Sequence, residues 1–185
     1  RYDPGMKEPH RLITAIRREQ IAERIEWLVE EIAPSAGGDG LAMIGILRGS
    51  FMFLADLCRA LHAHGVHPLI DFMTLESYYD GTESSGAVRI AKDCSIDVDG
   101  RRVLIVDDIL DTGRTLATAT EHLAAKGAVS VQTCVLLDKP ARRIVSFEAD
   151  YVGFTVEDRF VVGYGLDYAG HYRELPYIAQ VEMAE

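Results

Sequence analysis

Two kinds of hydrophobic segment alternate along the chain. Apolar residues recur at helical spacing between residues 19 and 32, as in an amphipathic helix with one buried face. Short continuous apolar runs, typical of buried strands, follow at 41–47, 68–75, 103–106, 129–137 and 151–156. Helices are expected at 51–64 and 116–126, each ended by a glycine. Strands that alternate with helices predict an α/β domain with a mostly parallel sheet.

The stretch from residue 103 to residue 115 combines an apolar strand, two carboxylates and a polar loop. Asp107 and Asp108 follow where the strand is expected to end, and residues 111–115 (DTGRT) lead into the next helix. Backbone N–H groups at a helix N-terminus, with the helix dipole behind them, bind phosphate. The carboxylates would repel a phosphate, so they should face hydroxyls or a hard cation. A phosphorylated ribose, with a metal-bound group beyond it, fits this arrangement.

Composition and charge narrow the class of protein further. A chain of 185 residues is the size of one domain. Its net charge of −10 counts against non-specific nucleic-acid binding, which needs a basic face. No apolar stretch is long enough to predict a membrane span. The three cysteines, Cys58, Cys94 and Cys134, show no CxxC spacing and are expected to be reduced thiols, which predicts a cytoplasmic protein.

The sequence VLIVDDILDTGRT at 103–115 resembles the phosphoribosyl-pyrophosphate (PRPP) signature of the type I phosphoribosyltransferases. Two other interpretations are open. One is an ordinary buried strand with a solvated acidic turn. The other is a phospho-acceptor receiver domain, but there the acidic pair opens the domain, and only 78 residues (185 − 107) follow Asp107 here. The lack of a GxxxxGKS or GxxxxGKT motif argues against a P-loop nucleotidase.

A second strand–loop–helix unit lies at residues 41–64. Its loop, Arg48-Gly49-Ser50, resembles the pyrophosphate-binding loop of the family. Family members often have a non-proline cis peptide there, which would fall between Leu47 and Arg48. Lysine is common where this chain has Arg48, and the two cations are not interchangeable at a bidentate site. The pyrophosphate contacts are therefore expected to differ in detail.

A polar loop at residues 77–86 separates the strand at 68–75 from a returning strand at 88–91. A plain hairpin needs only two to five loop residues, so the excess length predicts a mobile lid. An ordinary exposed hairpin is the alternative. In the family this loop closes over the bound substrates, and Ser77 and Tyr78 match its closing motif.

The tail at residues 160–180, FVVGYGLDYAGHYRELPYIAQ, resembles the purine-binding segment of the hypoxanthine-guanine phosphoribosyltransferases. With this tail, the resemblance extends from about residue 41 to residue 180. It implies a single domain with a five-stranded, mostly parallel core sheet flanked by helices, at about 36–158. A small hood would cover the core and consist of residues 159–185 plus part of the N-terminal arm, where a short element is expected at 11–16.

The activity that the resemblance implies is purine salvage. The 5-phosphoribosyl group of PRPP would pass to hypoxanthine and guanine, giving IMP and GMP plus pyrophosphate, with Mg²⁺ as cofactor. A homo-oligomer, dimer or tetramer, is expected, without nucleic-acid or membrane partners. An alternative from another class is a regulatory protein of the same fold that senses PRPP or purines and has weak or no catalysis.

The motifs also imply a role for each site residue. Asp111 would act as general base or acid at the purine ring, although an aspartate just ahead of a helix is also a common N-cap. The 5-phosphate would contact the DTGRT residues Asp111, Thr112, Gly113, Arg114 and Thr115. The pyrophosphate would contact Arg48, Gly49 and Arg173.

The remaining roles concern the ribose, the metal and the base. Asp107 and Asp108 would face the ribose hydroxyls and one Mg²⁺, and Asp167 would bind a second Mg²⁺. The ring of Phe160 would stack on the purine, and Lys139 would read its six-position. The purine site would thus comprise Ile109, Lys139, Phe160, Val161 and Asp167.

Overall fold

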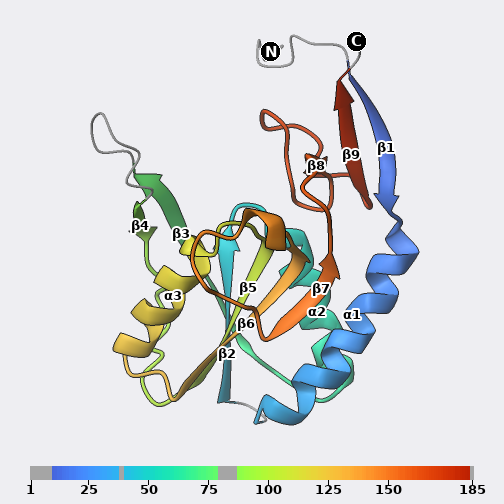
Figure 1. The fold of residues 1–185 in the computed structure, drawn as a ribbon. Helices are drawn as coiled ribbons and strands as arrows, with labels where there is room; N and C mark the ends of the chain where they lie inside the picture. Colours follow the sequence, from blue (N-terminus) through green and yellow to red (C-terminus); the bar gives the residue numbers. More distant parts are fainter. Residues whose placement is uncertain (1–9, 38–39, 79–86, 184–185) are drawn as a thin grey trace.

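A six-stranded sheet forms the centre of the molecule in the computed structural model, which describes residues 10–37, 40–78 and 87–183 (Figure 1). The strand order is β4-β3-β2-β5-β6-β7, and only β4 runs antiparallel to its neighbour. The strands are β2 (Leu41–Leu47), β3 (Leu69–Tyr78), β4 (Ala87–Lys92), β5 (Arg102–Leu110), β6 (Ser130–Asp138) and β7 (Tyr151–Thr155). The prediction of an α/β domain with a five-stranded parallel core is confirmed.

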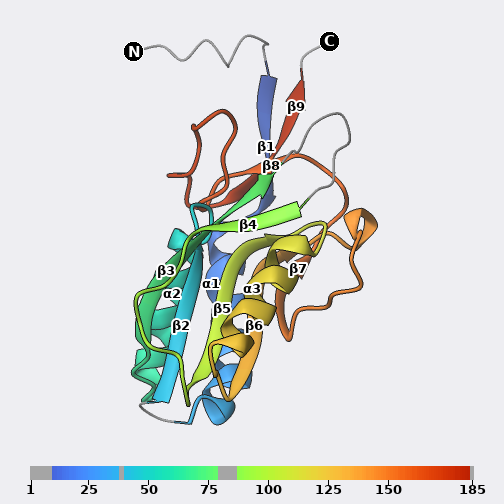
Figure 2. The ribbon, with the colours of Figure 1, turned by 90° about the vertical axis from the view of Figure 1, so that its left-hand side faces the viewer.

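Helices cover both faces of this sheet (Figure 2). The helices α1 (Arg18–Ile32) and α2 (Phe51–Ala63) pack on one face, and α3 (Arg114–Ala125) packs on the other. Short 3₁₀ turns follow α1 at Ala33–Ser35 and β6 at Pro140–Arg142. The apolar run of β5 is buried on both sides, because Leu104 and Val106 face α1 and α2 while Val103 and Ile105 face α3. Such two-sided burial explains its continuous apolar sequence.

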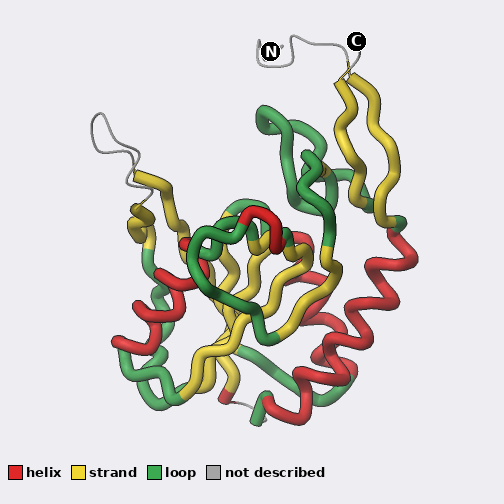
Figure 3. Tube along the Cα trace, viewed as in Figure 1, coloured by secondary structure: helices red, strands yellow, loops and turns green. Residues whose placement is uncertain are grey.

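A second, three-stranded sheet brings the two ends of the described chain together above the carboxyl ends of the parallel strands (Figures 1 and 3). It consists of β1 (His10–Ile16), β9 (Ile178–Met183) and β8 (Val161–Val162), in the order β1-β9-β8. The pairing of β1 with β9 is antiparallel, and Arg11 forms an ion pair of 2.6 Å with Glu182 across it. The short element expected at 11–16 is therefore an edge strand.

Three differences from the predicted element boundaries lie close to the candidate site. The strand β5 continues to Leu110, because it keeps pairing with β6 after its pairing with β2 ends at Val106. The helix α3 begins at Arg114 instead of Leu116, so the last two residues of DTGRT are helical. Ser77 and Tyr78 belong to β3, and the loop predicted as a lid falls on residues 79–86, outside the described residues.

Two predictions from composition concern the cysteines and the membrane. Cys58, Cys94 and Cys134 are free thiols. In the described part of the chain, no helix has the length and apolar character required to cross a membrane.

Candidate active site

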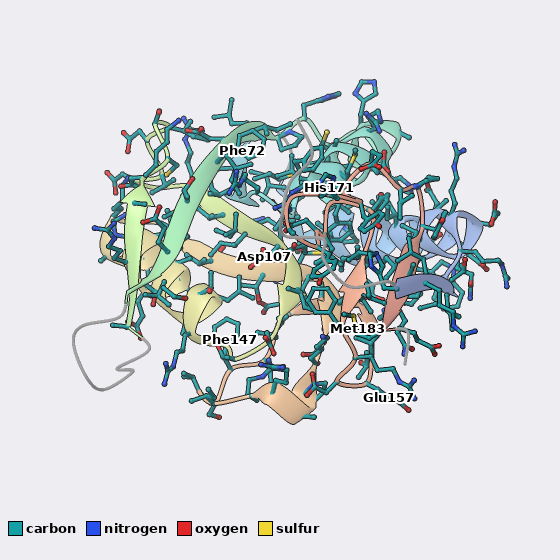
Figure 4. The ribbon with its side chains drawn as sticks, turned by 90° about the horizontal axis from the view of Figure 1, so that it is seen from above. Phe72, Asp107, Phe147, Glu157, His171 and Met183 are labelled. Atoms are coloured by element: carbon teal, nitrogen blue, oxygen red, sulfur yellow. The ribbon has the colours of Figure 1, made fainter. Side chains whose placement is uncertain are left out.

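A pocket of about 400 Å³ lies at the carboxyl ends of β2 and β5, and the second sheet stands above it. Each of these strands passes through a loop into a helix, residues 48–50 into α2 and residues 111–113 into α3. Ligands of open α/β sheets bind at such strand ends. Figure 4 looks down on this side and places Asp107 near its centre. The predicted residues that line the pocket are Arg48, Gly49, Ser77, Asp107, Asp108, Ile109, Asp111, Thr112, Gly113, Thr115, Asp167 and Arg173.

The floor of the pocket carries the acid pair, Asp107 and Asp108. Asp107 is only 5% exposed, and its Oδ1 accepts a hydrogen bond of 2.9 Å from the backbone N–H of Asp108. Burial raises the pKa of Asp107 well above its usual range, and the charge of Asp108 adds to the rise. Burial raises the pKa of Asp108 as well, against the opposing effects of hydrogen bonds from Asp107 and the backbone and, less strongly, of the charge of Arg173. The acid pair is thus suited to bind hydroxyl donors or a cation.

The acidic residues fit a magnesium ion that shares its coordination with a substrate. In the described residues, no three His, Cys, Asp or Glu side chains converge as a metal site. Asp167 has partners other than the acid pair. Its Oδ1 is 2.6 Å from Arg173 Nη2, and its Oδ2 accepts a 2.7 Å hydrogen bond from the Gly170 N–H. Magnesium commonly binds through one or two carboxylates plus substrate phosphates and water. The donor set matches that pattern and not an all-protein cage.

The 111–113 loop ends in the N-terminus of α3. Gly113 is the N-cap, with a left-handed φ of 87° and no side chain of its own to cap the helix, and Thr112 Oγ1 accepts a 3.4 Å hydrogen bond from the Arg114 N–H. A Cβ at Gly113 would also lie 3.1 Å from both Arg143 Cδ and the Val145 carbonyl oxygen. The interpretation of Asp111 as an N-cap is therefore wrong, because the glycine enters the helix directly. The backbone of Thr112 to Thr115 remains suited to an anion.

Asp111 Oδ1 is buried and accepts no hydrogen bond, although Arg142 Nε lies 3.0 Å away. The Arg142 N–H is not aligned with this oxygen, so the contact is an ion pair alone. A buried acceptor without a donor is uncommon and costs free energy. A ligand N–H in the pocket could supply the missing donor.

Arg143 supports the same loop and was not singled out from the sequence. Its guanidinium donates to the carbonyl oxygens of Leu110 and Asp111 and to the Asp138 carboxylate. The amides of residues 144 and 145 both donate to the Thr112 carbonyl oxygen, at 3.0 and 3.1 Å. These contacts tie the end of β5 to the end of β6. An arginine after a strand gives no sequence signal for such a role.

The 48–50 loop packs tightly against the acid pair. The peptide bond between Leu47 and Arg48 is cis, as expected from the resemblance. Ser50 Oγ donates a 2.6 Å hydrogen bond to the Ile46 carbonyl oxygen and closes the turn. A Cβ at Gly49 would lie 1.5 Å from Asp108 Oδ2. Only glycine allows this approach of the loop to the carboxylate.

Arg173 reaches the pocket from the C-terminal tail. It donates a 2.6 Å hydrogen bond to the Gly165 carbonyl oxygen and pairs with Asp167. Gly165 in turn packs on Gly49, since a Cβ there would lie 2.0 Å from the Gly49 carbonyl oxygen. Arg48, Gly49 and Arg173 thus line one pocket. Their contacts to pyrophosphate stay a prediction.

The other predicted residues lie outside this pocket. Lys139 is 7% exposed, and its Nζ donates a 2.6 Å hydrogen bond to the Arg159 carbonyl oxygen. Phe160 is 53% exposed, and its ring lies edge-on to Tyr168 at 5.5 Å between centroids. Val161 pairs with Gln180 in the second sheet. Arg114, the first residue of α3, lines a different hollow and not this pocket.

Comparisons with known proteins agree with this geometry. The family model "Phosphoribosyl transferase domain" matches residues 13–169. A hypoxanthine phosphoribosyltransferase of Escherichia coli K12 is 44% identical over 93% of this chain and 96% of that protein. A hypoxanthine-guanine phosphoribosyltransferase of Aquifex aeolicus is 44% identical over 90% of this chain and 93% of its own length. A crystal structure of a Staphylococcus aureus hypoxanthine phosphoribosyltransferase superposes with a TM-score of 0.85 at 42% identity, covering 92% of this chain and 91% of the other.

Proposed function

The chain belongs to the phosphoribosyltransferase family, and we propose that it transfers the 5-phosphoribosyl group of PRPP to hypoxanthine and guanine. IMP or GMP forms, and pyrophosphate leaves. One observation supports this function above the others: an acid pair, of which Asp107 is buried, lies between two helix N-termini in a single pocket. The relatives are transferases by name, and no observation favours the sensing alternative.

In this proposal the pocket holds PRPP by its three chemical parts. The backbone and hydroxyls of residues 112–115, at the start of α3, bind the 5-phosphate. Asp107 and Asp108 accept hydrogen bonds from the ribose hydroxyls. Arg48, Gly49 and Arg173 contact the pyrophosphate. Asp107 and Asp108 would hold a magnesium ion that enters with PRPP, and the ion would supply positive charge to offset the anionic substrate.

The reaction places positive charge on the sugar as the bond to pyrophosphate breaks. Its transition state is oxocarbenium-like, so a pre-arranged negative environment stabilises it. The acid pair and Asp111 provide that environment on one side of the pocket. Asp111 Oδ1, which lacks a hydrogen-bond donor, is assigned to accept the proton of the purine ring nitrogen as the new bond forms.

The purine in this proposal lies between the end of β6 and the tail. The exposed ring of Phe160 stacks on it, and Ile109 packs at its edge. Main-chain carbonyls near Val161 and Asp167 accept from the two-amino group of guanine. Lys139 Nζ has three donors, of which the Arg159 carbonyl oxygen occupies one, and Asp158 Oδ1 lies 4.0 Å away, beyond hydrogen-bond distance, so donors remain for the oxygen at the six-position.

We expect the protein to use 6-oxopurines and to reject adenine, because Lys139 can donate but cannot accept. A site built around such a partner can discriminate by ~10⁴–10⁵. The Lys139→Gln variant should lose catalytic efficiency with hypoxanthine and narrow its lead over adenine, since an amide can also accept. The measurement is kcat/KM for hypoxanthine, guanine and adenine. An unchanged ratio in the variant would show that Lys139 does not read the base.

The function itself is tested by a turnover assay. The protein is incubated with PRPP, Mg²⁺ and each purine base, and nucleotide products are separated by chromatography. IMP and GMP are expected as products. A protein that binds PRPP but forms no nucleotide with any base would contradict the proposal and favour the sensing alternative.

Three further expectations belong to this proposal. Residues of about 36–158 act as the core, and residues of about 159–185, with part of the N-terminal arm, act as the hood. The protein works in the cytoplasm, where Cys58 and its two fellow thiols stay reduced. It assembles as a homo-oligomer, and the half-exposed apolar residues Leu69 and Ile70 at the start of β3 are available for subunit contacts.

A further inference from the structure

The tight turn at residues 163–166 has an unusual residue in its bend. Gly163 and Leu166 exchange backbone hydrogen bonds of 3.0 and 3.1 Å, and both central residues have left-handed backbones. Gly165, with a φ of 102°, suits such a turn, but Tyr164 has a φ of 50°. Asparagine, aspartate or glycine is the usual choice there. A bulky aromatic held in this conformation persists only where its surroundings enforce it, and such residues cluster at functional sites.

Contacts on three sides hold Tyr164 in this backbone conformation. Its ring is 7% exposed and belongs to the hydrophobic core between the main sheet and the helices α1 and α2. Its backbone N–H donates a 2.8 Å hydrogen bond to the Leu175 carbonyl oxygen. Its hydroxyl donates to the Asp56 carboxylate on α2. Burial raises the pKa of Tyr164, so the hydroxyl remains a donor throughout the physiological range.

The turn and α2 meet again at the pocket. Gly165 packs on the carbonyl oxygen of Gly49, the residue just before Ser50, which is the N-cap of α2. The Gly165 amide donates a 3.0 Å hydrogen bond to the Arg173 carbonyl oxygen, and Arg173 donates back to the Gly165 carbonyl oxygen. The turn therefore holds Arg173 in place through these two hydrogen bonds. Gly49 is held in place by its chain connection to α2.

We propose that Tyr164 is a positioning residue for the transfer reaction, which locks the turn at 163–166 onto α2 through Asp56 and so fixes Arg173 against Gly49. This inference rests on the proposed function, because Arg173 and Gly49 contact pyrophosphate there. Tyr164 itself does not line the PRPP pocket, and it acts only through the turn. Its ring and Asp56 instead border a separate hollow of about 660 Å³ between α1, α2 and residues 174–176.

The test compares Tyr164→Phe, which removes only the hydroxyl, with the wild type. The KM for PRPP should rise on the order of tenfold with little change in kcat, well within the ~10²-fold loss that a misplacement of 1 Å can cause. Amide hydrogen exchange should become faster in the segment 163–175, where the Tyr164 and Gly165 amides are bonded. Both measurements are made far below the unfolding temperature, so a change in global stability alone moves neither.

Three variants of α2 extend this test, two at Asp56 and one at Arg59. Asp56→Asn keeps an acceptor for the hydroxyl and should behave as wild type, whereas Asp56→Ala should reproduce Tyr164→Phe. Arg59→Ala removes the exposed ion pair that Arg59 makes with the same carboxylate and should change neither measurement. If Arg59→Ala matches Tyr164→Phe, the ion pair between Arg59 and Asp56 accounts for the effect and the hydroxyl contact does not.

The outcomes separate this inference from the proposed function. A wild type without turnover would remove the function, and exchange in 163–175 would then decide whether Tyr164 holds the turn. With an active wild type, an unchanged KM for PRPP in Tyr164→Phe overturns the positioning role even if the unfolding temperature falls. A higher KM without faster exchange overturns it as well, because the effect would then reach the pocket by another route.

Discussion

Asp111→Asn is expected to lower kcat by ~10²–10⁴-fold while the KM for PRPP changes little. Asparagine has nearly the shape of aspartate, and the loop's backbone contacts to Arg143 and residues 144–145 do not involve this side chain. The amide cannot take the proton of the purine ring, so the loss should fall on the chemical step. Steady-state kinetics with hypoxanthine, together with PRPP binding by calorimetry, measures the two effects separately.

Arg142→Gln is the control for this prediction, because Asp111→Asn also removes the ion pair with Arg142. The pair is half exposed on the Arg142 side, and exposed pairs contribute roughly 0–1 kcal/mol. Arg142→Gln should therefore leave kcat within a few-fold of wild type. A comparable loss in both variants would indicate that the ion pair, and not proton transfer, accounts for the effect. Near-normal turnover in Asp111→Asn would exclude Asp111 as the base.

The parallel core could be predicted because local sequence carries most of its information. Strands buried on both faces are continuous apolar runs, and α1 shows its buried face at helical spacing in Ile21, Ile25 and Leu28. The loops at residues 48–50 and 111–113 could be placed for the same reason, since each follows such a run. Loops at the carboxyl ends of neighbouring parallel strands must then meet at one edge of the sheet.

Contacts between distant segments could not be read from local patterns. The pairing of β1 with β9 joins residues more than 160 positions apart, and nothing near His10 indicates its partner. The same holds for the Tyr164 hydroxyl, which meets Asp56 across 108 positions. Strand ends were misjudged because pairing with β6, and not hydrophobicity, extends β5 past its apolar run to Leu110. Polar residues at a sheet's end continue a strand whenever a neighbour still offers backbone partners.

Removal of divalent metal is expected to abolish turnover, and magnesium should restore it. PRPP is a dense anion, and the pocket presents the acid pair to it with Arg48 and Arg173 as the cationic side chains of its lining. The carboxylates of Asp107 and Asp108 would add negative charge beside the bound polyanion, so PRPP needs an accompanying cation. Turnover is measured in excess EDTA and again after an excess of Mg²⁺ is added. Full activity in EDTA would contradict the assignment of the acid pair.

Magnesium alone, without PRPP or pyrophosphate, should bind poorly to this pocket. No three acidic, histidine or cysteine side chains converge in the described residues, so most ligands of the ion must come from substrate and water. The unfolding temperature should therefore change little with Mg²⁺ alone and rise clearly with Mg²⁺ plus pyrophosphate. At a ligand concentration of 100 times Kd, the gain in the free energy of unfolding should be about 2.7 kcal/mol. Asp108→Asn should weaken that joint effect and raise the Mg²⁺ concentration needed for half-maximal turnover. An equal shift with Mg²⁺ alone would instead mean that the chain holds a complete metal site of its own.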